Sequence, residues 1–403
     1  MFKLLSINLG NLGSTGKIMY GISEIAMKNG YRTFCAYPKR DTNAILNKND
    51  YIICNNLFRK IYEKLDGYLG IQNSFSIIST LFLIKKINKI HPNIIQLHNL
   101  HGGYINLLIF FNYLYRKNIS VVWTLHDCWA FTGRCPHFVL QRCEKWKTSC
   151  EKCTYPKEMY PIAYFDHTKL MWEKKKKLFT KLKNLTIVTP SFWLADLVEE
   201  SFLKNYNIKV INNGIDLEIF KPRESNFREK YKIEDKFLIL GVSNAWGYSK
   251  GLDAFIELSK ELDEQYQIVL VGTNDCIDKM LPDNIITIHR TDNQKELAKI
   301  YSIADIFVNP TREDTFPTVN IEALACGTPV ITFNTGGSPE IIDSKSGIVI
   351  NSNKIKDLKE KIIGLKENNL FKKDDCINRA RLFDQKDRFK EYVNLYDEVL
   401  KQK

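Results

Sequence analysis

The chain has 403 residues, which is too long for one ordinary hydrophobic core, so we expect two domains of about 200 residues each. Its 44% hydrophobic and 26% charged residues are typical of a globular protein, and ten cysteines are too few for a disulfide scaffold. The 58 Lys and Arg against 46 Asp and Glu give a net charge of +12, which favours anionic partners: nucleotide diphosphates, nucleic acid or an anionic membrane surface.

Apolar strand-like runs alternate with helical patterns along the whole chain. They cover residues 2–7, 94–98, 121–125, 186–188, 209–211, 237–242, 267–271, 285–288, 306–308 and 330–333. Continuous β-branched strands separated by helices predict parallel sheets that are covered on both faces. The fold class that follows is α/β.

The first residues, 1–8, turn polar too soon for a signal peptide and read as a first strand. No apolar run approaches the about 20 residues that span a bilayer. We therefore expect a cytoplasmic protein, with peripheral contact to the inner face of the cell membrane left open.

The domain boundary is predicted where a strand and turn at 210–216 are followed by the break at Pro222. We expect an N-terminal domain over 1–207, a C-terminal domain over 208–385 and a closing helix over 386–403. That last helix carries an apolar stripe at helical spacing: Phe389, Tyr392, Val393, Tyr396 and Leu400.

A glycine-rich loop, 10–17, follows the first strand and opens a helix. Glycines such as Gly13 let backbone N–H groups approach an anion at a helix N-terminus. The loop is not a P-loop, because that motif requires Gly where Asn11 stands and Ser or Thr where Ile18 stands. A structural turn and a phosphate-binding loop both remain open.

Two histidines stand at the ends of predicted strands, His98 as the last residue of 94–98 and His126 just after 121–125. Ligands of open α/β sheets bind at the carboxyl ends of the strands. A lone histidine is more often structural, but strand-end placement with Asp127 adjacent favours a functional role for His126.

Four cysteines fall within one short segment of the N-terminal half: Cys135, Cys143, Cys150 and Cys153. In a cytosolic chain this density suggests tetrahedral zinc more than disulfides, with Cys128 and His137 as alternate ligands. Free thiols or another use stay open. A structural zinc would pin an insertion over about 128–160 beside His126.

Lys174, Lys175, Lys176 and Lys177 lie in a predicted helix together with apolar residues. A basic amphipathic helix suits an anionic membrane surface. An exposed charged helix with a core stripe explains the same pattern.

In the C-terminal half, polar and glycine residues follow several predicted strands. Lys250, in a Lys-Gly pair after strand 237–242, can place a compact charge on a diphosphate, although a solvated surface lysine is the alternative. Gly272 follows strand 267–271 and Arg290 follows strand 285–288, both at the ligand edge.

The most informative window is 311–340. Asp314, with Glu313 beside it, precedes Glu322 by eight positions, and a small-residue stretch, a strand and the Gly336-Gly337 pair follow. Ionised acids accept hydrogen bonds from vicinal hydroxyls, which suits a sugar or ribose. The two glycines let the backbone approach a ligand or simply form a turn.

These motifs, in this order, resemble the retaining glycosyltransferases of family 4, and the resemblance covers almost the whole chain. It implies the GT-B fold, with two Rossmann-like doubly wound domains facing a central cleft. It also implies a closing helix that packs back on the N-terminal domain. The chain departs from the family pattern in having Asp314 where the first acid is usually Glu, and Ala245 where an Arg usually precedes Lys250 by five positions.

The resemblance also assigns roles. Lys250 with Gly251 would bind the diphosphate, with Arg312 or Arg290 as candidates for the missing Arg. His126 would hold the transferred sugar. Donor binding would further involve the Gly13 loop, Gly272, Gly336, Gly337, and Arg290 at the nucleobase side.

Within the acid pair, Glu322 would bind the ribose, and Asp314 or Glu313 would bind the donor sugar. From its similar strand-end position, and not from the resemblance, we expect His98 at the acceptor side. Catalysis needs no divalent metal, because the second half has no Asp-x-Asp, and a structural zinc is the only cofactor considered.

The predicted function is that of a hexosyltransferase-type enzyme. It would move a sugar from a UDP or GDP sugar to a glycan or lipid-linked acceptor in surface polysaccharide biosynthesis, without a nucleic-acid partner. One alternative is a nucleotide-sugar 2-epimerase or phosphorylase of the same fold. The other is a zinc-bearing nucleic-acid-binding protein, which the charge and the cysteines permit.

Overall fold

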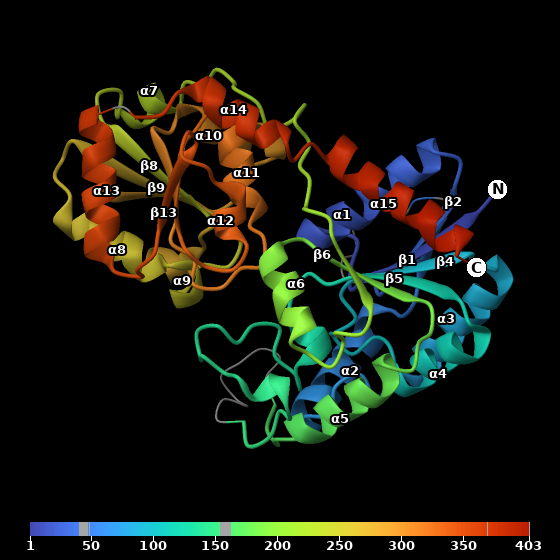
Figure 1. Cartoon of the computed structure of the whole chain (residues 1–403). Helices are drawn as coiled ribbons and strands as arrows, with labels where there is room; N and C mark the ends of the chain where they lie inside the picture. The colour runs from blue at the N-terminus through green and yellow to red at the C-terminus, as the bar shows by residue number, and fades with distance from the viewer. Residues whose placement is uncertain (40–46, 48, 154–162, 369, 403) are drawn as a thin grey trace. The chain divides into compact units, whose positions relative to one another are not determined.

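The computed structural model describes residues 1–39, 47, 49–153, 163–368 and 370–402. The chain forms two compact units: unit 1 is Met1–Asn212 with Lys386–Lys403, and unit 2 is Asn213–Gln385 (Figure 1). Unit 1 runs to Asn212 because Ile211 still donates its N–H to the Thr189 carbonyl, at 3.0 Å. Residues 154–160 of the expected insertion lie outside the described part of the chain.

Unit 1 contains a seven-stranded parallel sheet with the order β3-β2-β1-β4-β5-β6-β7. Its strands are β1 (Lys3–Ile7), β2 (Arg32–Tyr37), β3 (Asp50–Ile52), β4 (Ile94–Leu97), β5 (Ser120–Thr124), β6 (Leu185–Thr189) and β7 (Asn207–Val210).

Three helices of unit 1 begin at side-chain caps: the side chains of Asn55, Asn106 and Ser191 accept hydrogen bonds from the first turns of α2, α4 and α6. The α-helices are α1 (Gly13–Lys28), α2 (Asn56–Leu69), α3 (Ile77–Ile90), α4 (Leu107–Lys117), α5 (Thr168–Phe179), α6 (Phe192–Glu199) and α15 (Gln385–Lys401). Two short 3₁₀ helices, η1 (Trp129–Phe131) and η2 (Lys145–Lys147), lie in the cysteine-rich segment.

The sheet of unit 1 is buried on both faces, as continuous apolar strands require. In β1, Leu4 packs into one cluster with residues of α1 and α15, whereas Leu5 and Ile7 pack into a second cluster with residues of α3, α4 and α5. Side chains that alternate along the strand therefore supply two separate cores.

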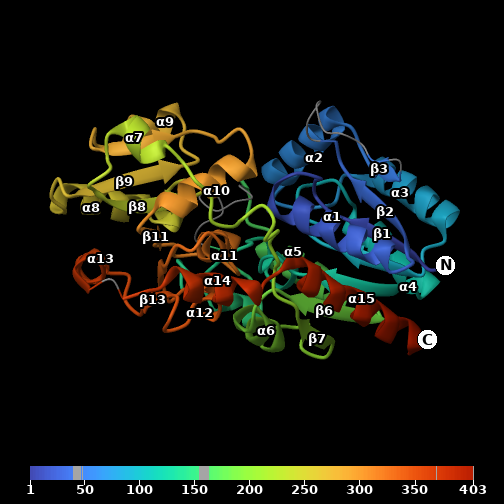
Figure 2. The same ribbon diagram turned by 90° about the horizontal axis from the view of Figure 1, so that it is seen from above.

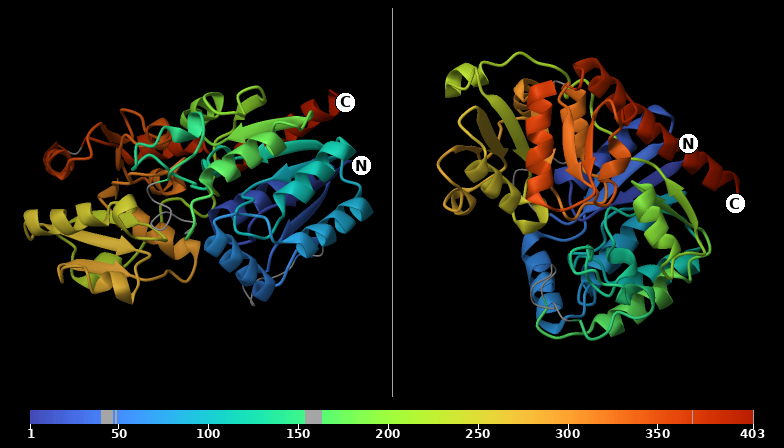
Figure 3. Two further views of the ribbon diagram at one scale, coloured as in Figure 1. Left: turned by 90° about the horizontal axis from the view of Figure 1, so that it is seen from below. Right: turned by 60° about the vertical axis from the view of Figure 1, so that its left-hand side comes forward.

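Helix α15 completes the first of these clusters from the far end of the sequence (Figure 3). Its Tyr392 lies 3.3 Å from the Thr124 hydroxyl, its Tyr396 donates to Gln96, and its Asp397 accepts from Tyr31. The ring of Phe389 packs on Gly21 of α1, where no side chain intervenes. The last helix therefore belongs to the core of unit 1.

Unit 2 contains a six-stranded parallel sheet with the order β10-β9-β8-β11-β12-β13. Its strands are β8 (Phe237–Val242), β9 (Tyr266–Val271), β10 (Ile285–Ile288), β11 (Ile306–Asn309), β12 (Val330–Phe333) and β13 (Gly347–Ile350). In β8, Leu238 and Leu240 face one apolar cluster and Ile239 faces another, so this sheet is also covered on both sides.

In unit 2, α7 precedes the first strand, and at least one helix follows each strand (Figure 2). They are α7 (Phe227–Tyr231), α8 (Leu252–Glu261), α9 (Asp275–Asp278), α10 (Gln294–Ile303), α11 (Thr318–Ala325), α12 (Ser338–Ile341), α13 (Ile355–Asn368) and α14 (Lys373–Arg381), with the 3₁₀ helix η3 (Tyr248–Lys250) before α8. Within the described residues, no helix is both long and apolar enough to cross a membrane.

Each sheet has a point where the strand order reverses. In unit 1 it lies between β1 and β4, and in unit 2 between β8 and β11. The loops that leave these neighbouring strands run to opposite sides and open a crevice at the carboxyl edge, which is where ligands bind in such sheets. These two positions therefore direct the search for a site.

Candidate functional site

The reversal point of unit 2 brings Lys250 and Asp314 together. Lys250 stands at the end of η3, after β8, and Asp314 stands in the loop after β11. The Lys250 Nζ lies 2.7 Å from Asp314 Oδ2 and also donates to the Glu313 carbonyl, at 3.0 Å. Both side chains keep about a quarter of their surface exposed, 28% and 24%. A cation is thus fixed at the ligand edge and remains within reach of solvent.

Two glycines hold the neighbouring loops against this pair. Gly272, after β9, has φ +90°, and a Cβ there would stand 1.7 Å from the Ser243 carbonyl oxygen. Gly336, after β12, has φ +56°, and a Cβ there would stand 1.7 Å from the Asp314 carbonyl oxygen. Gly337 donates its N–H to the Thr315 carbonyl, at 3.1 Å. Any side chain at 272 or 336 would push the loops of the site apart.

Glu322 lies on α11 and is held by a partner that the sequence did not reveal. The Tyr301 hydroxyl of α10 donates to Glu322 Oε2, at 3.1 Å. Burial raises the pKa of Tyr301 well above its ordinary value, and the charge of Glu322 raises it further, so the phenol stays a donor at neutral pH. Glu322 is therefore an oriented carboxylate acceptor.

The two arginines considered for the missing cation are placed differently. Arg312 is buried and its guanidinium binds both carboxylate oxygens of Asp253, at 2.7 and 2.8 Å. It also donates to the Tyr248 carbonyl, at 2.7 Å, so it braces the loop that carries Lys250. Arg290 is exposed just beyond β10, the edge strand of the sheet. The expectation that Arg312 replaces the family arginine does not fit this burial and pairing.

The reversal point of unit 1 brings His98 and His126 together. His98 Nδ1 lies 2.9 Å from His126 Nε2, and the rings stack at 5.2 Å with an interplanar angle of 13°. Burial lowers the pKa of His126 to about 4 and that of His98 well below its ordinary value. At neutral pH the pair is uncharged, with one ring nitrogen donating and the other accepting.

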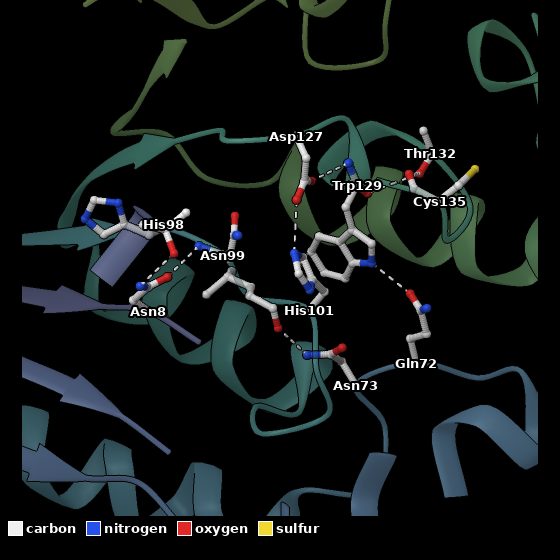
Figure 4. Close-up of polar contacts among 12 residues, drawn as sticks. Asn8, Gln72, Asn73, His98, Asn99, His101, Asp127, Trp129, Thr132 and Cys135 are labelled. Atoms are coloured by element: carbon white, nitrogen blue, oxygen red, sulfur yellow. Dashed lines mark hydrogen bonds and ion pairs between the residues drawn. The ribbon is translucent and has the colours of Figure 1, made fainter. Parts of the chain in front are cut away.

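A third imidazole at this edge of the sheet, that of His101, is paired with a carboxylate (Figure 4). His101 Nε2 lies 3.0 Å from Asp127 Oδ2, while the Trp129 N–H donates to Asp127 Oδ1 at 2.8 Å. Burial would raise the pKa of Asp127, but His101 and the backbone hydrogen bond lower it overall. Trp129 in turn donates to Gln72, at 2.7 Å. Sequence reasoning gave His101 no role and used Asp127 only as the neighbour of His126, although His101 stands three residues beyond the predicted strand 94–98.

The glycine loop lies beside these histidines. Gly13 begins α1 with φ +75°, and nothing stands within 4 Å of the place where its Cβ would be. The side chain of Asn8 donates to the Gly10 carbonyl, at 2.8 Å, and accepts from the Asn99 N–H, at 3.3 Å (Figure 4). Asn8 thereby ties the loops after β1 and β4 at the reversal point.

The four cysteines predicted as zinc ligands lie around one cavity of about 320 Å³. All ten cysteines of the chain are free of disulfides. Within the residues that the structure describes, no three His, Cys, Asp or Glu side chains come together as a metal-binding group. The thiols are thus gathered around a shared space, and zinc binding stays a prediction.

The lysine run next to this segment is not a solvated basic face. Lys175 of α5 is fully buried, with its Nζ 2.8 Å from the Trp129 carbonyl, 3.1 Å from the Thr132 carbonyl and 3.6 Å from the centre of the Trp129 ring. Burial lowers the pKa of Lys175 to about 7. Lys174 donates to the Ser74 hydroxyl, at 2.7 Å. Only Lys176 and Lys177 of the four are exposed, so the membrane hypothesis for α5 does not fit.

Comparison with known sequences gives a family. Residues 223–383, within unit 2, match the family described as Glycosyl transferases group 1. The chain is 24% identical over 278 residues to WcaC of Escherichia coli K12, named as a colanic acid biosynthesis glycosyl transferase, covering 66% of this chain and 65% of that protein.

A second relative is the N,N'-diacetylbacillosaminyl-diphospho-undecaprenol alpha-1,3-N-acetylgalactosaminyltransferase of Campylobacter jejuni. It is 28% identical over 222 residues, covering 51% of this chain and 58% of that protein. The chain therefore aligns with a little under two thirds of the length of these relatives.

Solved structures agree over the whole chain. Sucrose-phosphate synthase from Thermosynechococcus elongatus has a TM-score of 0.75 at 17% identity, and Anabaena Alr3699/HepE in complex with UDP-glucose has 0.68 at 13%, each comparison covering 100% of both chains. These likenesses confirm the predicted GT-B fold. With the family match, they lead to one conclusion: the chain has the GT-B fold, and its residues 223–383 match the group 1 glycosyltransferases.

Proposed function

We propose that the protein is a retaining glycosyltransferase that moves a sugar from a nucleoside-diphosphate sugar to a glycan or lipid-linked acceptor in surface polysaccharide synthesis. The observation that carries the proposal is the Lys250–Asp314 pair at the reversal point of unit 2. Support comes from the relatives named for colanic acid biosynthesis and for a diphospho-undecaprenol acceptor, and from the Anabaena structure with UDP-glucose.

In this proposal Lys250 stabilises the leaving diphosphate. The bond between the anomeric carbon and the phosphate oxygen breaks, and negative charge grows on that oxygen in the transition state. A compact ammonium placed there favours the transition state over the ground state. Because Asp314 already neutralises Lys250, an incoming diphosphate competes for the lysine, and the released Asp314 carboxylate then binds hydroxyls of the sugar.

The remaining groups position the donor. Glu322, oriented by Tyr301, accepts hydrogen bonds from the ribose hydroxyls. His126 is assigned to the transferred sugar. The acceptor hydroxyl attacks the same face that the diphosphate leaves and passes its proton to the departing phosphate oxygen, so configuration is retained without a protein nucleophile. We place the reaction in the cytoplasm, because all ten cysteines are free of disulfides.

The first test measures thermal unfolding with UDP, GDP and their common sugars. A ligand that binds only the folded state raises the midpoint. We expect one nucleotide to raise it selectively, and Lys250→Gln and Glu322→Gln each to abolish most of the rise. Lys260→Gln, at an exposed position of α8, is the matched control and should keep it.

The second test identifies the stereochemistry. Once the donor is known, the anomeric configuration of the product, measured by NMR, should equal that of the donor. A product with inverted anomeric configuration would overturn the retaining mechanism alone. In the first test, an unfolding midpoint that no nucleotide raises would overturn the donor site.

A further inference from the structure

His98 and His126 form a stacked pair at the carboxyl ends of two neighbouring strands of unit 1. His98 directly follows β4, and His126 stands two residues beyond β5. Their ring nitrogens, His98 Nδ1 and His126 Nε2, lie 2.9 Å apart, and the rings are nearly parallel, at 13°. His126 is partly exposed, whereas His98 is only 1% exposed. A ligand at this edge of the sheet can therefore touch His126 but not the ring of His98.

The backbone of His98 is bonded to the strands on both sides of it. Its N–H donates to the Ile7 carbonyl of β1, at 2.9 Å, and its carbonyl accepts from the indole N–H of Trp123 of β5, at 3.0 Å. The Trp123 ring is buried against the rings of Phe111 and Phe179. A side chain held in this way by hydrogen bonds and core packing can fix the orientation of a more exposed neighbour.

The carboxylate next to His126 in the sequence has other partners. Asp127 Oδ2 lies 3.0 Å from His101 Nε2, and Asp127 Oδ1 accepts from the Trp129 N–H, at 2.8 Å (Figure 4). A carboxylate is a common group for fixing the proton of a functional histidine. Here the Asp127 carboxylate orients His101 instead, and the side chain in place to orient the His126 ring is His98.

The second ring nitrogen of His98 indicates which ring donates in the pair. His98 Nε2 is buried, and among the residues that the structure describes it has no hydrogen-bond partner. A buried N–H without an acceptor is rarer in proteins than a buried acceptor without a donor. This favours a neutral His98 whose proton is on Nδ1 and is donated to His126 Nε2. The proton of a neutral His126 is then on its own Nδ1.

We infer that His98 is a positioning residue, which fixes the orientation and the tautomer of the His126 ring. A hydroxyl of the transferred sugar that reaches this ring meets an N–H donor on Nδ1, and not a bare nitrogen. The inference rests on the proposed function, which assigns His126 to that sugar. It also gives His98 a role other than acceptor binding, because its buried ring acts through His126.

The first test is nitrogen-15 NMR of the full chain with labelled histidine, at neutral pH and without nucleotide. Correlations between the ring hydrogens and the ring nitrogens distinguish a protonated nitrogen from a bare one. In the wild type we expect both His98 and His126 to be protonated on Nδ1 and bare on Nε2. In His98→Phe, which keeps a stacked ring but no donor, the His126 Nε2 signal should move to that of a nitrogen without a hydrogen bond.

The second test separates the sugar from the nucleotide. Calorimetric titrations use UDP and UDP-glucose, and GDP and GDP-mannose. We expect His98→Phe to weaken binding of the nucleotide sugar about tenfold, the effect of one hydrogen bond, and to leave binding of the diphosphate unchanged. His98→Asn should stay within about threefold of the wild type, because its amide N–H replaces the Nδ1 donor.

A double-mutant cycle tests whether His98 acts through His126. His126→Phe should weaken binding of the nucleotide sugar about as much as His98→Phe does. The double variant should then lose no more than His126→Phe alone, because residues that act as one unit are not additive. His91→Phe is the control, since His91 is exposed at the end of α3 and should keep both affinities.

Unfolding midpoints of all variants are measured first, because His98 is buried. If His98→Phe does not fold, the wild-type spectrum and His98→Asn decide the inference. A His126 protonated on Nε2 in the wild type would overturn it. Equal weakening of diphosphate and nucleotide sugar, or additive losses in the double variant, would do the same. A wild type that binds no nucleotide would instead overturn the proposed donor site, and the tautomer would still be decided by NMR.

Discussion

Lys250 shows how the loops of unit 2 prepare a cation for its ligand. The lysine forms an ion pair with Asp314. Arg312 braces the loop that carries Lys250 and forms its own ion pair with Asp253. The same loop therefore takes part in two ion pairs, Lys250–Asp314 and Arg312–Asp253. Of the two cations, Arg312 is buried, whereas Lys250 is partly exposed and can exchange Asp314 for a diphosphate. An arginine near position 245 would add a second cation, but this chain has Ala245.

Restoring that cation should strengthen donor binding. Ala245 is exposed in the loop after β8, so Ala245→Arg can be accommodated without repacking. We expect it to tighten binding of the nucleoside diphosphate by about tenfold, which is the effect of one charge-assisted hydrogen bond. Isothermal titration calorimetry measures it.

Asn244→Arg is the control for Ala245→Arg, because it adds the same charge one residue away on the exposed loop. Equal tightening by both variants would mean that general charge, and not a specific contact, is responsible. No tightening by Ala245→Arg would mean that position 245 does not face the diphosphate.

At the level of residues, strand-end position directed attention to Lys250, Asp314 and His126, because polar residues after buried parallel strands gather at one edge. The family resemblance then gave Lys250 and Asp314 their expected roles, and those roles stay predictions. Tyr301 was missed because it lies in the middle of α10, where a tyrosine reads as core until its hydroxyl is seen 3.1 Å from Glu322. His101 was missed because its partner Asp127 comes from another strand, and a pairing across 26 residues leaves no local pattern.

At the scale of elements, periodicity predicts that a helix has an apolar face but not where that face points. The lysine run of α5 reads as a basic surface, yet Lys175 is buried against Trp129. In α2 the opposite occurs, because Asp66 faces inward and the leucines face outward. Strands β2, β3 and β13 were not among the predicted runs. β3 and β13 have 3 and 4 residues, and β2 begins with the polar pair Arg32-Thr33.

The cysteine-rich segment makes a prediction about metal content. Four thiols surround one cavity that Arg134 also lines, and the buried Lys175 interacts electrostatically with Cys135 and Cys150. A thiolate-bound zinc would balance those charges and pin the segment. We expect one zinc per chain, measured by mass spectrometry of the purified protein, and its loss in Cys150→Ser and in Cys153→Ser.

Cys276→Ser is the matched control for the zinc prediction, because Cys276 is exposed in unit 2. It should keep the metal. Protein that contains no zinc after purification in zinc-supplemented buffer, and whose thiols react equally with and without a chelator, would exclude the site.

The packing of α15 on α1 makes a prediction about stability. A Cβ on Gly21 would stand 2.3 Å from Phe389 Cε2, and that ring is buried. Gly21→Ala should therefore lower the free energy of unfolding by about 1–3 kcal/mol, because the ring cannot move without opening the core. Urea denaturation followed by circular dichroism measures it.

Gly364→Ala is the control for this prediction, since Gly364 also lies inside a helix but has nothing within 4 Å of its missing Cβ. It should raise the free energy of unfolding by about 0.5–1 kcal/mol through helix propensity alone. Stabilisation by Gly21→Ala would mean that α15 does not hold Phe389 on α1 in solution.

At the scale of the whole molecule, the chain crosses between two separately packed units twice, near 212 and near 385. Each unit has its own apolar clusters, so each is able to unfold as a unit. A ligand stabilises the part that binds it. A nucleotide held by unit 2 should therefore raise the unfolding midpoint of unit 2 and leave that of unit 1 nearly unchanged.

The distribution of tryptophan makes this measurable. Five of the six tryptophans lie in unit 1, and only Trp246 lies in unit 2. Fluorescence therefore follows mainly unit 1, whereas far-ultraviolet circular dichroism follows both units. With nucleotide at about 100 times its Kd, we expect the midpoint of the part of the dichroism transition that reports unit 2 to rise by about 5–10 °C. The midpoint followed by fluorescence, which reports mainly unit 1, should stay unchanged. Lys250→Gln should abolish the rise. Coincident midpoints that move together would instead mean that the two units unfold as one cooperative body, with nucleotide binding energy shared between them.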